Sequence, residues 1–274
     1  MSAQPAPHKP VTVRTEKIEI NMKKVLPLLA PILLFAASPI SLHAQVATNA
    51  PPPKPKWESS AAAGVTLTRG NSSTLLATLS GKTGRKWDGN ELSLGADAAY
   101  GESKVNGVTS RNADSIDGFA QYNRLFTERL YGYGRVDALH DEIADIKYRV
   151  VLAPGLGYYF IKDKKTELGA EVGPGYVIEE LDGNRDSYAS LRVGEKFHQE
   201  ISDRARIWEN AEWLPQVDKF KNYIVNAELG IEADLTADKR LALRAVLQDT
   251  YNNEPAPARQ KNDAKLITAI AYKF

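Results

Sequence analysis

The sequence YIVNAELGIEADL, residues 223–235, alternates apolar and polar side chains. Its odd positions are apolar throughout, whereas Glu228, Glu232 and Asp234 stand at even positions. Successive side chains of a β-strand point to opposite faces of a sheet, so this period of two predicts a strand with one apolar and one charged face. A helix would distribute the same charges around its axis.

The same alternation recurs at 92–100, 168–178 and 241–248. Turn signals divide residues 57–274 into strands of similar length, with about eighteen residues for each strand and its turn, which suits tilted strands that cross a bilayer. We therefore predict an all-β fold, a transmembrane antiparallel up-and-down β-barrel of about 12 strands. The expected strands are 57–69, 74–87, 91–103, 113–126, 129–140, 145–161, 166–181, 184–200, 204–217, 221–235, 239–252 and 262–274.

The connections and the aromatic residues support this interpretation. Tight turns follow the even strands, and longer loops are expected at 104–112 and 252–262. Short turns on one side and longer loops on the other are typical of outer-membrane barrels, with both termini in the periplasm. Barrels also carry aromatic belts at both interfaces. We expect Trp57, Trp87, Phe126, Tyr131, Tyr158, Phe160, Tyr272 and Phe274 in the periplasmic belt, and Tyr100, Tyr148, Tyr176, Tyr188, Trp213, Tyr223 and Tyr251 in the outer belt.

The N-terminal region predicts export. Residues 22–44 combine a basic start, an apolar run and small residues before Gln45, as in a secretory signal peptide, and we expect cleavage after Ala44. Residues 1–21 precede a second plausible initiator at Met22 and are interpreted as an untranslated or disordered extension. Residues 45–56 are proline-rich and predict a stiff periplasmic linker. The barrel is expected at 57–274, in the bacterial outer membrane after Sec export.

Composition excludes several classes of function. The 274 residues include 35 basic and 34 acidic side chains, so bulk charge does not favour nucleic-acid binding. There is no cysteine, which excludes disulfide scaffolds, thiolate metal sites and cysteine nucleophiles, and we expect no cofactor. A soluble barrel or sandwich would also alternate, but charges in mid-strand favour a wet interior over a packed core.

The C-terminal strand ends on an aromatic carboxylate. Ile270, Tyr272 and Phe274 lie on one face, similar to the terminal signal that outer-membrane assembly machinery recognises. The chain also resembles one bacterial family, the salt-induced outer-membrane proteins, a domain of unknown function. The similar stretches are GVTLTRGNSST at 64–74, TERLY at 127–131, GLGY at 155–158, GPGY at 173–176 and YKF at 272–274. This resemblance implies a single outer-membrane barrel and carries no catalytic residues. The expected partners are outer-membrane lipid and, during biogenesis, the assembly machinery and periplasmic chaperones, around a monomer.

No motif predicts catalysis or metal binding. His140 and His198 lack a nucleophile and an orienting group nearby, so we interpret them as solvated histidines. Residues 182–186, DGNRD, lack the closing glutamate of a calcium loop and suit a hairpin turn better. The loops at 104–112 and 252–262 could contact surface ligands, which the sequence does not identify. We expect a protein that is not an enzyme.

The charges predicted to face the lumen, the interior of the barrel, are balanced, with eight basic against eight acidic side chains. A selective pore would be lined mainly by one sign, whereas balance allows cross-strand ion pairs that narrow the channel. We therefore expect a constricted lumen and a structural role in the envelope or in salt or osmotic stress; the alternative is a narrow passive channel for small solutes or oligosaccharides. The principal candidates are Asp97, Arg135, Asp137, Arg149, Glu171, Arg192, Glu212, Glu228, Glu232 and Arg244.

Overall fold

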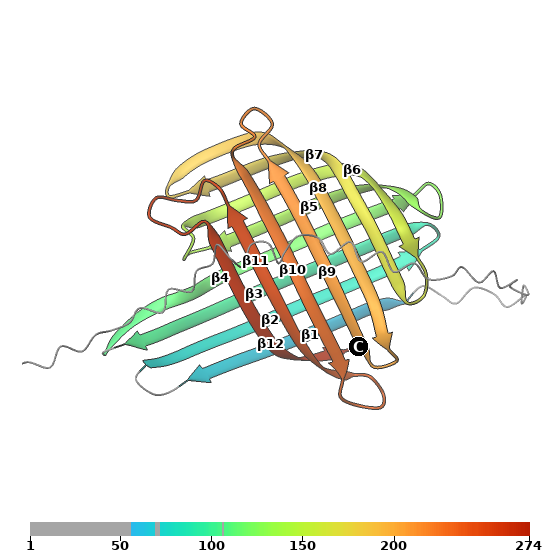
Figure 1. The fold of residues 1–274 in the computed structure, drawn as a ribbon, viewed down its shortest axis with the longest axis horizontal. Helices are drawn as coiled ribbons and strands as arrows, with labels where there is room; N and C mark the ends of the chain where they lie inside the picture. The colour runs from blue at the N-terminus through green and yellow to red at the C-terminus, as the bar shows by residue number, and fades with distance from the viewer. Residues whose placement is uncertain (1–55, 69–71, 106) are drawn as a thin grey trace, which may run out of the picture. The chain divides into compact units, whose positions relative to one another are not determined.

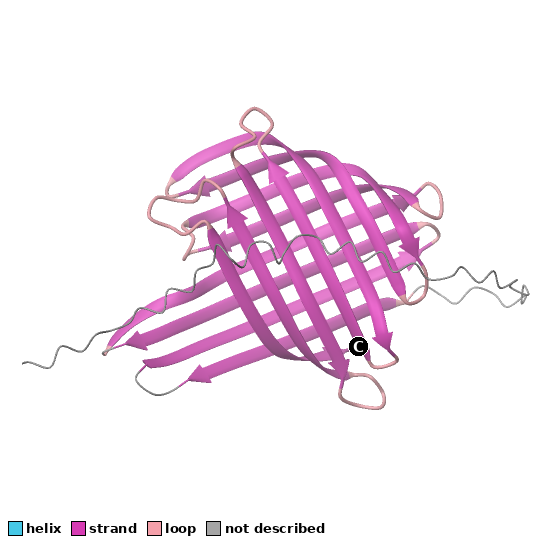
Figure 2. Ribbon diagram, in the orientation of Figure 1, coloured by secondary structure: helices cyan, strands magenta, loops and turns pink. Residues whose placement is uncertain are grey.

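A computed structural model describes residues 56–68, 72–105 and 107–274. The predicted signal peptide, the extension 1–21 and nearly all of the linker lie outside the described residues. Every regular element described is a strand, as Figure 2 shows. The strands are β1 (Trp57–Thr68), β2 (Ser72–Trp87), β3 (Asn90–Val105), β4 (Val108–Leu125), β5 (Leu130–Asp141), β6 (Ile146–Lys162), β7 (Thr166–Leu181), β8 (Asn184–Ser202), β9 (Ala205–Pro215), β10 (Tyr223–Asp234), β11 (Leu241–Asn252) and β12 (Asn262–Lys273).

The strands form one closed antiparallel barrel in which each strand pairs with its neighbours in sequence and β12 pairs with β1 (Figure 1). This confirms the predicted all-β, up-and-down barrel of about twelve strands. We call the end with Trp57 and Phe274 the terminal end, and the opposite end the loop end. No helix in the described part of the chain is long and apolar enough to span a membrane.

The prediction of a long loop between β3 and β4 is wrong. Residues 104–112 were expected to form a long loop, but β3 continues to Val105 and β4 begins at Val108, and the two residues pair with each other. Gly107 has φ of 83°, which glycine adopts at little cost. The dipeptide Asn-Gly is favoured in two-residue hairpin turns, which accounts for strands that continue so far into this segment. The predicted loop at 252–262 is confirmed, since residues 253–261 connect β11 to β12.

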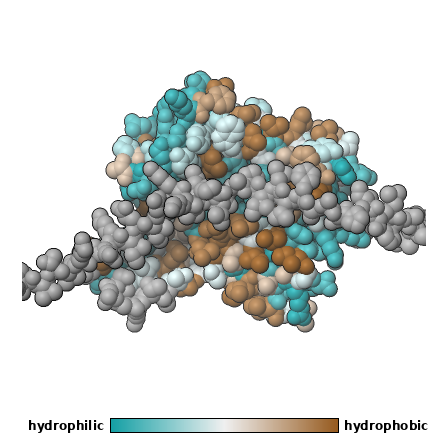
Figure 3. All heavy atoms as spheres, viewed as in Figure 1, coloured by the Kyte–Doolittle hydropathy of each residue, from teal (hydrophilic) through white to brown (hydrophobic). Residues whose placement is uncertain are grey.

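The barrel is apolar outside and polar inside. Arg149, Glu171 and Glu232 are buried, although a soluble core rarely contains such charges. Hydrophobic residues gather on the outer wall in Figure 3. The exposed apolar side chains include Leu79, Val136, Leu152, Leu156, Val172, Leu229, Ile231, Leu243, Leu247, Leu266 and Ile270.

The pairing that closes the barrel is much shorter than the others. We call it the seam. β1 and β12 pair from Ser60↔Lys273 to Ala63↔Ile270, and Ser59 and Phe274 exchange two backbone hydrogen bonds beyond it. The other eleven strand pairs each contain between nine and sixteen residue pairs. The seam is therefore the least extensively hydrogen-bonded junction of the wall.

Candidate functional site

The inner faces of β4 to β9 carry a charge cluster centred on Glu171 of β7. Its carboxylate accepts bonds from Arg192 Nη1 at 2.8 Å and Lys196 Nζ at 2.6 Å, both on β8. Gln121 Nε2 at 2.7 Å and the Tyr131 hydroxyl at 2.9 Å also donate to it. The Glu171 and Arg192 side chains are only 1% and 4% exposed. Water therefore hardly reaches this ion pair.

The cluster continues on both sides. Arg192 also bonds to Glu212 of β9, which accepts a further bond from Asn226 at 3.2 Å. On β5, Arg135 bonds to Asp137 and donates to Gln121 at 3.0 Å. The polar contacts therefore run continuously along the inner wall from β4 to β10.

A second cluster surrounds Glu232 of β10 at the terminal end. Arg206 and Arg244 each lie 2.7 Å from its carboxylate, and Lys273 lies at 3.2 Å. Arg244 also donates to the hydroxyl of Ser60 at 3.3 Å. Because Ser60 is on β1 and Lys273 is on β12, this cluster links both strands of the seam.

Several polar contacts join strands that are far apart around the barrel. Lys82 of β2 lies 3.2 Å from Glu228 of β10, and Lys86 of β2 lies 3.2 Å from Glu167 of β7. Glu91 of β3 lies 3.0 Å from Lys162 of β6. Such contacts require the side chains to cross the lumen. They narrow it at several depths.

The structure brings most predicted lumen charges together. Arg135 and Asp137 pair with each other, Glu171, Arg192 and Glu212 form one chain of contacts, and Glu232 pairs with Arg244. Two predicted charges have other partners, since Arg149 lies 2.6 Å from Glu179 and Glu228 contacts Lys82. Asp97 differs from these because no side-chain hydrogen bond or ion pair to it occurs among the described residues.

Sequence reasoning missed important lumen residues. Tyr131 was assigned to the periplasmic belt and Tyr188 to the outer belt, but both are buried in the interior, at 0% and 8% exposure. Tyr131 lies inside the barrel because its hydroxyl donates a hydrogen bond to Glu171 and its ring contacts the ring of Tyr159. Tyr131 shares a strand face with Arg135, and Tyr188 shares one with Arg192, each four positions away, which was the available signal. The missed charged residues are Lys82, Lys86, Glu91, Asp117, Lys162 and Glu179.

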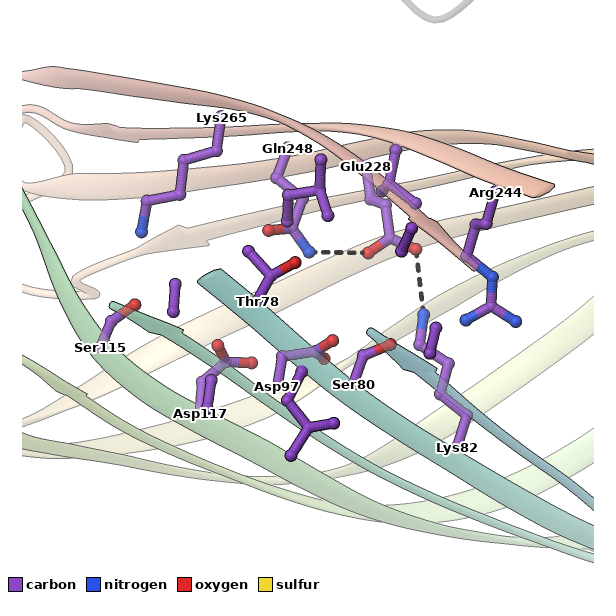
Figure 4. A pocket seen from close by; sticks show the side chains of 17 residues that line it. Thr78, Ser80, Lys82, Asp97, Ser115, Asp117, Glu228, Arg244, Gln248 and Lys265 are labelled. Atoms are coloured by element: carbon purple, nitrogen blue, oxygen red, sulfur yellow. Dashed lines mark hydrogen bonds and ion pairs between the residues drawn. The ribbon is translucent and has the colours of Figure 1, made fainter. Parts of the chain in front are cut away.

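A cavity of about 50 Å³ remains on one side of the lumen (Figure 4). Its lining combines Asp97 and Asp117, which are directly opposed on β3 and β4, with the hydroxyls of Thr78, Ser80 and Ser115. Lys82, Glu228, Arg244, Gln248 and Lys265 complete the polar part. A void of this size holds a few water molecules.

The loop end is tied across the barrel. Arg259, in the loop between β11 and β12, pairs with Asp145, in the loop between β5 and β6. The hydrogen bond from Arg259 lowers the pKa of Asp145 below its ordinary value of 3.8. Lys265 of β12 lies 3.6 Å from Asp141 of β5. These pairs hold two opposite walls together.

The remaining candidate groups have ordinary surroundings. The His140 ring contacts the carbonyl of Lys147 at 2.8 Å. Asp182 and Gly183 have φ of 49° and 73°, which fits the predicted hairpin turn. No group of three or more acidic or histidine side chains suited to a metal occurs in residues 56–68, 72–105 and 107–274.

The predicted assembly residues lie where the barrel closes. Ile270 pairs with Ala63 in the seam, and the Phe274 backbone bonds to Ser59. The rings of Tyr272 and Phe274 stack at 6.1 Å on the outside, where both are exposed.

Comparisons with solved structures find weak similarity. The NanC porin gives a TM-score of 0.48 at 7% identity, covering 78% of this chain and all of the porin. An outer membrane channel from Pseudomonas putida F1 gives 0.46 at 11% identity, covering 80% and 95% of the two chains. The autotransporter translocator domain of NalP from Neisseria meningitidis gives 0.43 at 16% identity, covering 80% and 87%.

No curated protein matches the sequence significantly. The sequence profile of one family does match, over residues 61–274, which is most of the chain and almost the whole barrel. The chain therefore belongs to the family described as "Protein of unknown function, DUF481".

Proposed function

We propose that this chain is an integral protein of the bacterial outer membrane, whose lumen is closed by charge pairing and whose role is structural. Supporting this location, exposed apolar side chains alternate with buried charged ones along the strands. In a closed barrel, neighbouring strands satisfy each other's backbone hydrogen bonds within the lipid. Unpaired backbone groups are tolerated at membrane depth only where they face protein or a water-filled cavity. In this arrangement the terminal end faces the periplasm, and residues 22–44 direct export.

The observation that carries the closed lumen is the set of polar contacts across it. A conducting porin needs a continuous aqueous path, lined by charges that water can reach. Here Glu171, Arg192 and Glu232 are almost fully buried. Lys82, Lys86 and Glu91 reach strands several positions away around the barrel. Water and solutes therefore meet a barrier of paired charges.

A structural barrel suits a role in envelope stability under salt or osmotic stress, which is the finer part of the proposal. Buried ion pairs are less screened by added salt than exposed ones, so the network would keep the barrel intact as ionic strength rises. A strain that lacks the protein should leak periplasmic enzymes at high salt, and the wild-type gene should restore the barrier.

Planar-bilayer recording of the purified full-length protein tests the closed lumen. We expect no steady conductance from the wild type. Replacing both cross-lumen lysines, in Lys82→Ala with Lys86→Ala, should produce measurable channels, whereas Lys219→Ala in an exposed loop pair should not. Steady conductance of the wild type would refute the closed lumen and favour the alternative, a narrow channel for small solutes, which the cavity beside Asp97 would serve.

A further inference from the structure

The seam is the place where the wall stops being continuous. Its ladder ends at Ala63 and Ile270, and beyond it no residue of β1 pairs with β12 in the described part of the chain. Figure 1 shows the two strands close at the end marked C and apart at their other ends. The loop-end halves of β1 and β12 therefore each present an unpaired edge.

Two features place β12 on the lumen side of β1 beyond the ladder. A Cβ atom at Gly64 would lie 2.3 Å from the Thr268 carbonyl oxygen, so the β12 backbone presses closely on β1 there. Gly64 shares the inward face of Ala62, which places Thr268 on the lumen side of β1. Beyond this crossing, the contact of Lys265 with Asp141 holds β12 toward the opposite wall.

An open edge at membrane depth is costly unless water reaches it. Unpaired backbone groups in hydrocarbon cost several kcal/mol each, and irregular backbone is tolerated in membranes only against protein or a wet cavity. The cavity described above lies on the lumen side of the seam. Its lining includes Ala62 of β1, which belongs to the ladder, and Ile267 and Ala269 of β12, which lie beyond the ladder, together with residues of β2–β4, β10 and β11. On the β12 side, the split therefore borders the cavity.

Two carboxylates of the cavity lining, Asp97 and Asp117, form no direct ion pair among the described residues. Asp97 and Asp117 are directly opposed across the ladder, an arrangement that is unfavourable for two like charges. The three cations of the lining each pair elsewhere. Lys82 pairs with Glu228, Arg244 with Glu232, and Lys265 with Asp141 and Asp263.

The hydroxyl of Ser115 also lines this cavity. Ser115 is only 9% exposed, its hydroxyl forms no hydrogen bond among the described residues, and Figure 4 shows this hydroxyl directed into the cavity beside Asp117. Toward the seam, the lining changes to Ala62, Ile267 and Ala269. The cavity thus offers carboxylates and a free hydroxyl at one side and apolar side chains next to the split.

We propose that the split seam is a lateral entrance from the bilayer and that the cavity binds the head group of a cationic amphiphile. The positively charged head would lie between Asp97 and Asp117, with Ser115 as a hydrogen-bonding partner, and the apolar tail would leave through the split. This inference rests on the proposed membrane-embedded barrel.

Tryptophan quenching in vesicles tests the cavity. Trp208 bonds to Glu228 at 2.7 Å beside the cavity, and Trp57→Phe, Trp87→Phe and Trp213→Phe would leave it as the only tryptophan. The probes are a primary alkylammonium, whose compact head group can donate hydrogen bonds, and an alkyl sulfate, each brominated on the same chain. Quenching through the wall is common to both probes. The cationic probe should quench at about tenfold lower concentration, the effect of one charge-assisted hydrogen bond or ion pair.

Matched variants identify the site. The double variant Asp97→Asn with Asp117→Asn should abolish the preference for the cationic probe. Glu195→Gln with Glu209→Gln removes the same charge from neighbouring β8 and β9 positions on the outer wall, where Glu209 pairs with the exposed Leu229. This control should retain the preference. Equal quenching by both probes in the unmodified cavity would overturn the proposal.

Disulfide trapping tests the route, because the chain contains no native cysteine. Ala63→Cys with Ile270→Cys lies in the seam ladder and should cross-link quickly. Thr66→Cys with Ile267→Cys lies in the split and should cross-link slowly; once trapped, it should abolish the cationic preference. Equal cross-linking rates, or a preference that survives trapping, would exclude a lateral entrance.

Vesicle flotation and heat-modifiable gel migration come first and separate the two proposals. A protein that does not insert refutes the membrane barrel and the entrance together. A protein that inserts, yet shows no preference for the cationic probe, refutes only the entrance.

Discussion

Replacing Glu171 by Gln should strongly destabilise the barrel. The substitution keeps the shape of the side chain but leaves Arg192 and Lys196 without their shared carboxylate. Removing one partner of a buried ion pair costs roughly 3–5 kcal/mol, because the other charge remains buried and unpaired. Arg192 keeps its second partner, Glu212, so we place the loss at the low end, about 3 kcal/mol.

Urea unfolding of the refolded protein, followed by tryptophan fluorescence, measures this loss. The matched control is Lys219→Ala, which breaks a pair with Glu254 whose side chains are 55% and 42% exposed. An exposed pair of this kind contributes at most about 1 kcal/mol. Combining Glu171→Gln with Arg192→Met should recover part of the loss, since the second change removes the unpaired cation.

The costs of the two single variants, compared with each other, show whether water reaches the Glu171 carboxylate. If Glu171→Gln costs no more than Lys219→Ala, then water solvates the Glu171 carboxylate in the folded barrel. The lumen would then be a hydrated pore and would not be closed by charge pairing. A cost of about 3 kcal/mol, with recovery in the double variant, requires a dry and coupled network.

Three further outcomes are expected. Gly64→Ala should lower the free energy of unfolding by about 1–3 kcal/mol, because the added methyl meets the β12 backbone, whereas Gly81→Ala, with no atom within 4 Å, should be tolerated in the same urea titration. Phe274→Ala should reduce the amount assembled in the outer membrane of cells while refolding in detergent proceeds normally, if Phe274 is an assembly signal. The bond from Arg259 lowers the pKa of Asp145, so their contact contributes to stability above the ordinary value of 3.8 and is lost as the pH falls through the lowered value; an NMR titration of the Asp145 carboxyl should shift upward in Arg259→Gln.

The strand count was predictable because a membrane-facing strand must keep one apolar face along its length. That requirement gives stretches such as residues 223–235 a period of two. The period can be recognised without knowing which strands pair with each other. The β4 phase was harder to read because Phe119 shares the inward face with polar residues. The Phe119 ring occupies the space that a Cβ atom at Gly95 would take. The Arg135 guanidinium lies over this ring, with its Cζ atom 4.5 Å from the ring centroid.

The pairing of the lumen charges was not predictable in the same way. Charge balance indicated that pairs would form, but contacts such as Lys82 with Glu228 join residues 146 positions apart. Their meeting depends on which walls approach each other across the lumen. Neighbouring-strand registers do not determine this. The short length of the seam could not be predicted from the sequence either, because the alternation of β12 continues past the point where its pairing with β1 ends.

The buried charges and the split seam are parts of one arrangement. At the terminal end, Glu232 gathers Arg244 and Lys273, and Arg244 reaches Ser60, so charge pairing reinforces the few rungs that join β1 to β12. Toward the loop end, Lys265 draws β12 to the opposite wall, and the rungs end. The same kind of contact therefore closes the seam at one end and parts it at the other. A barrel held mainly by its long hairpins and by contacts across its lumen can leave part of one junction unpaired and still remain closed.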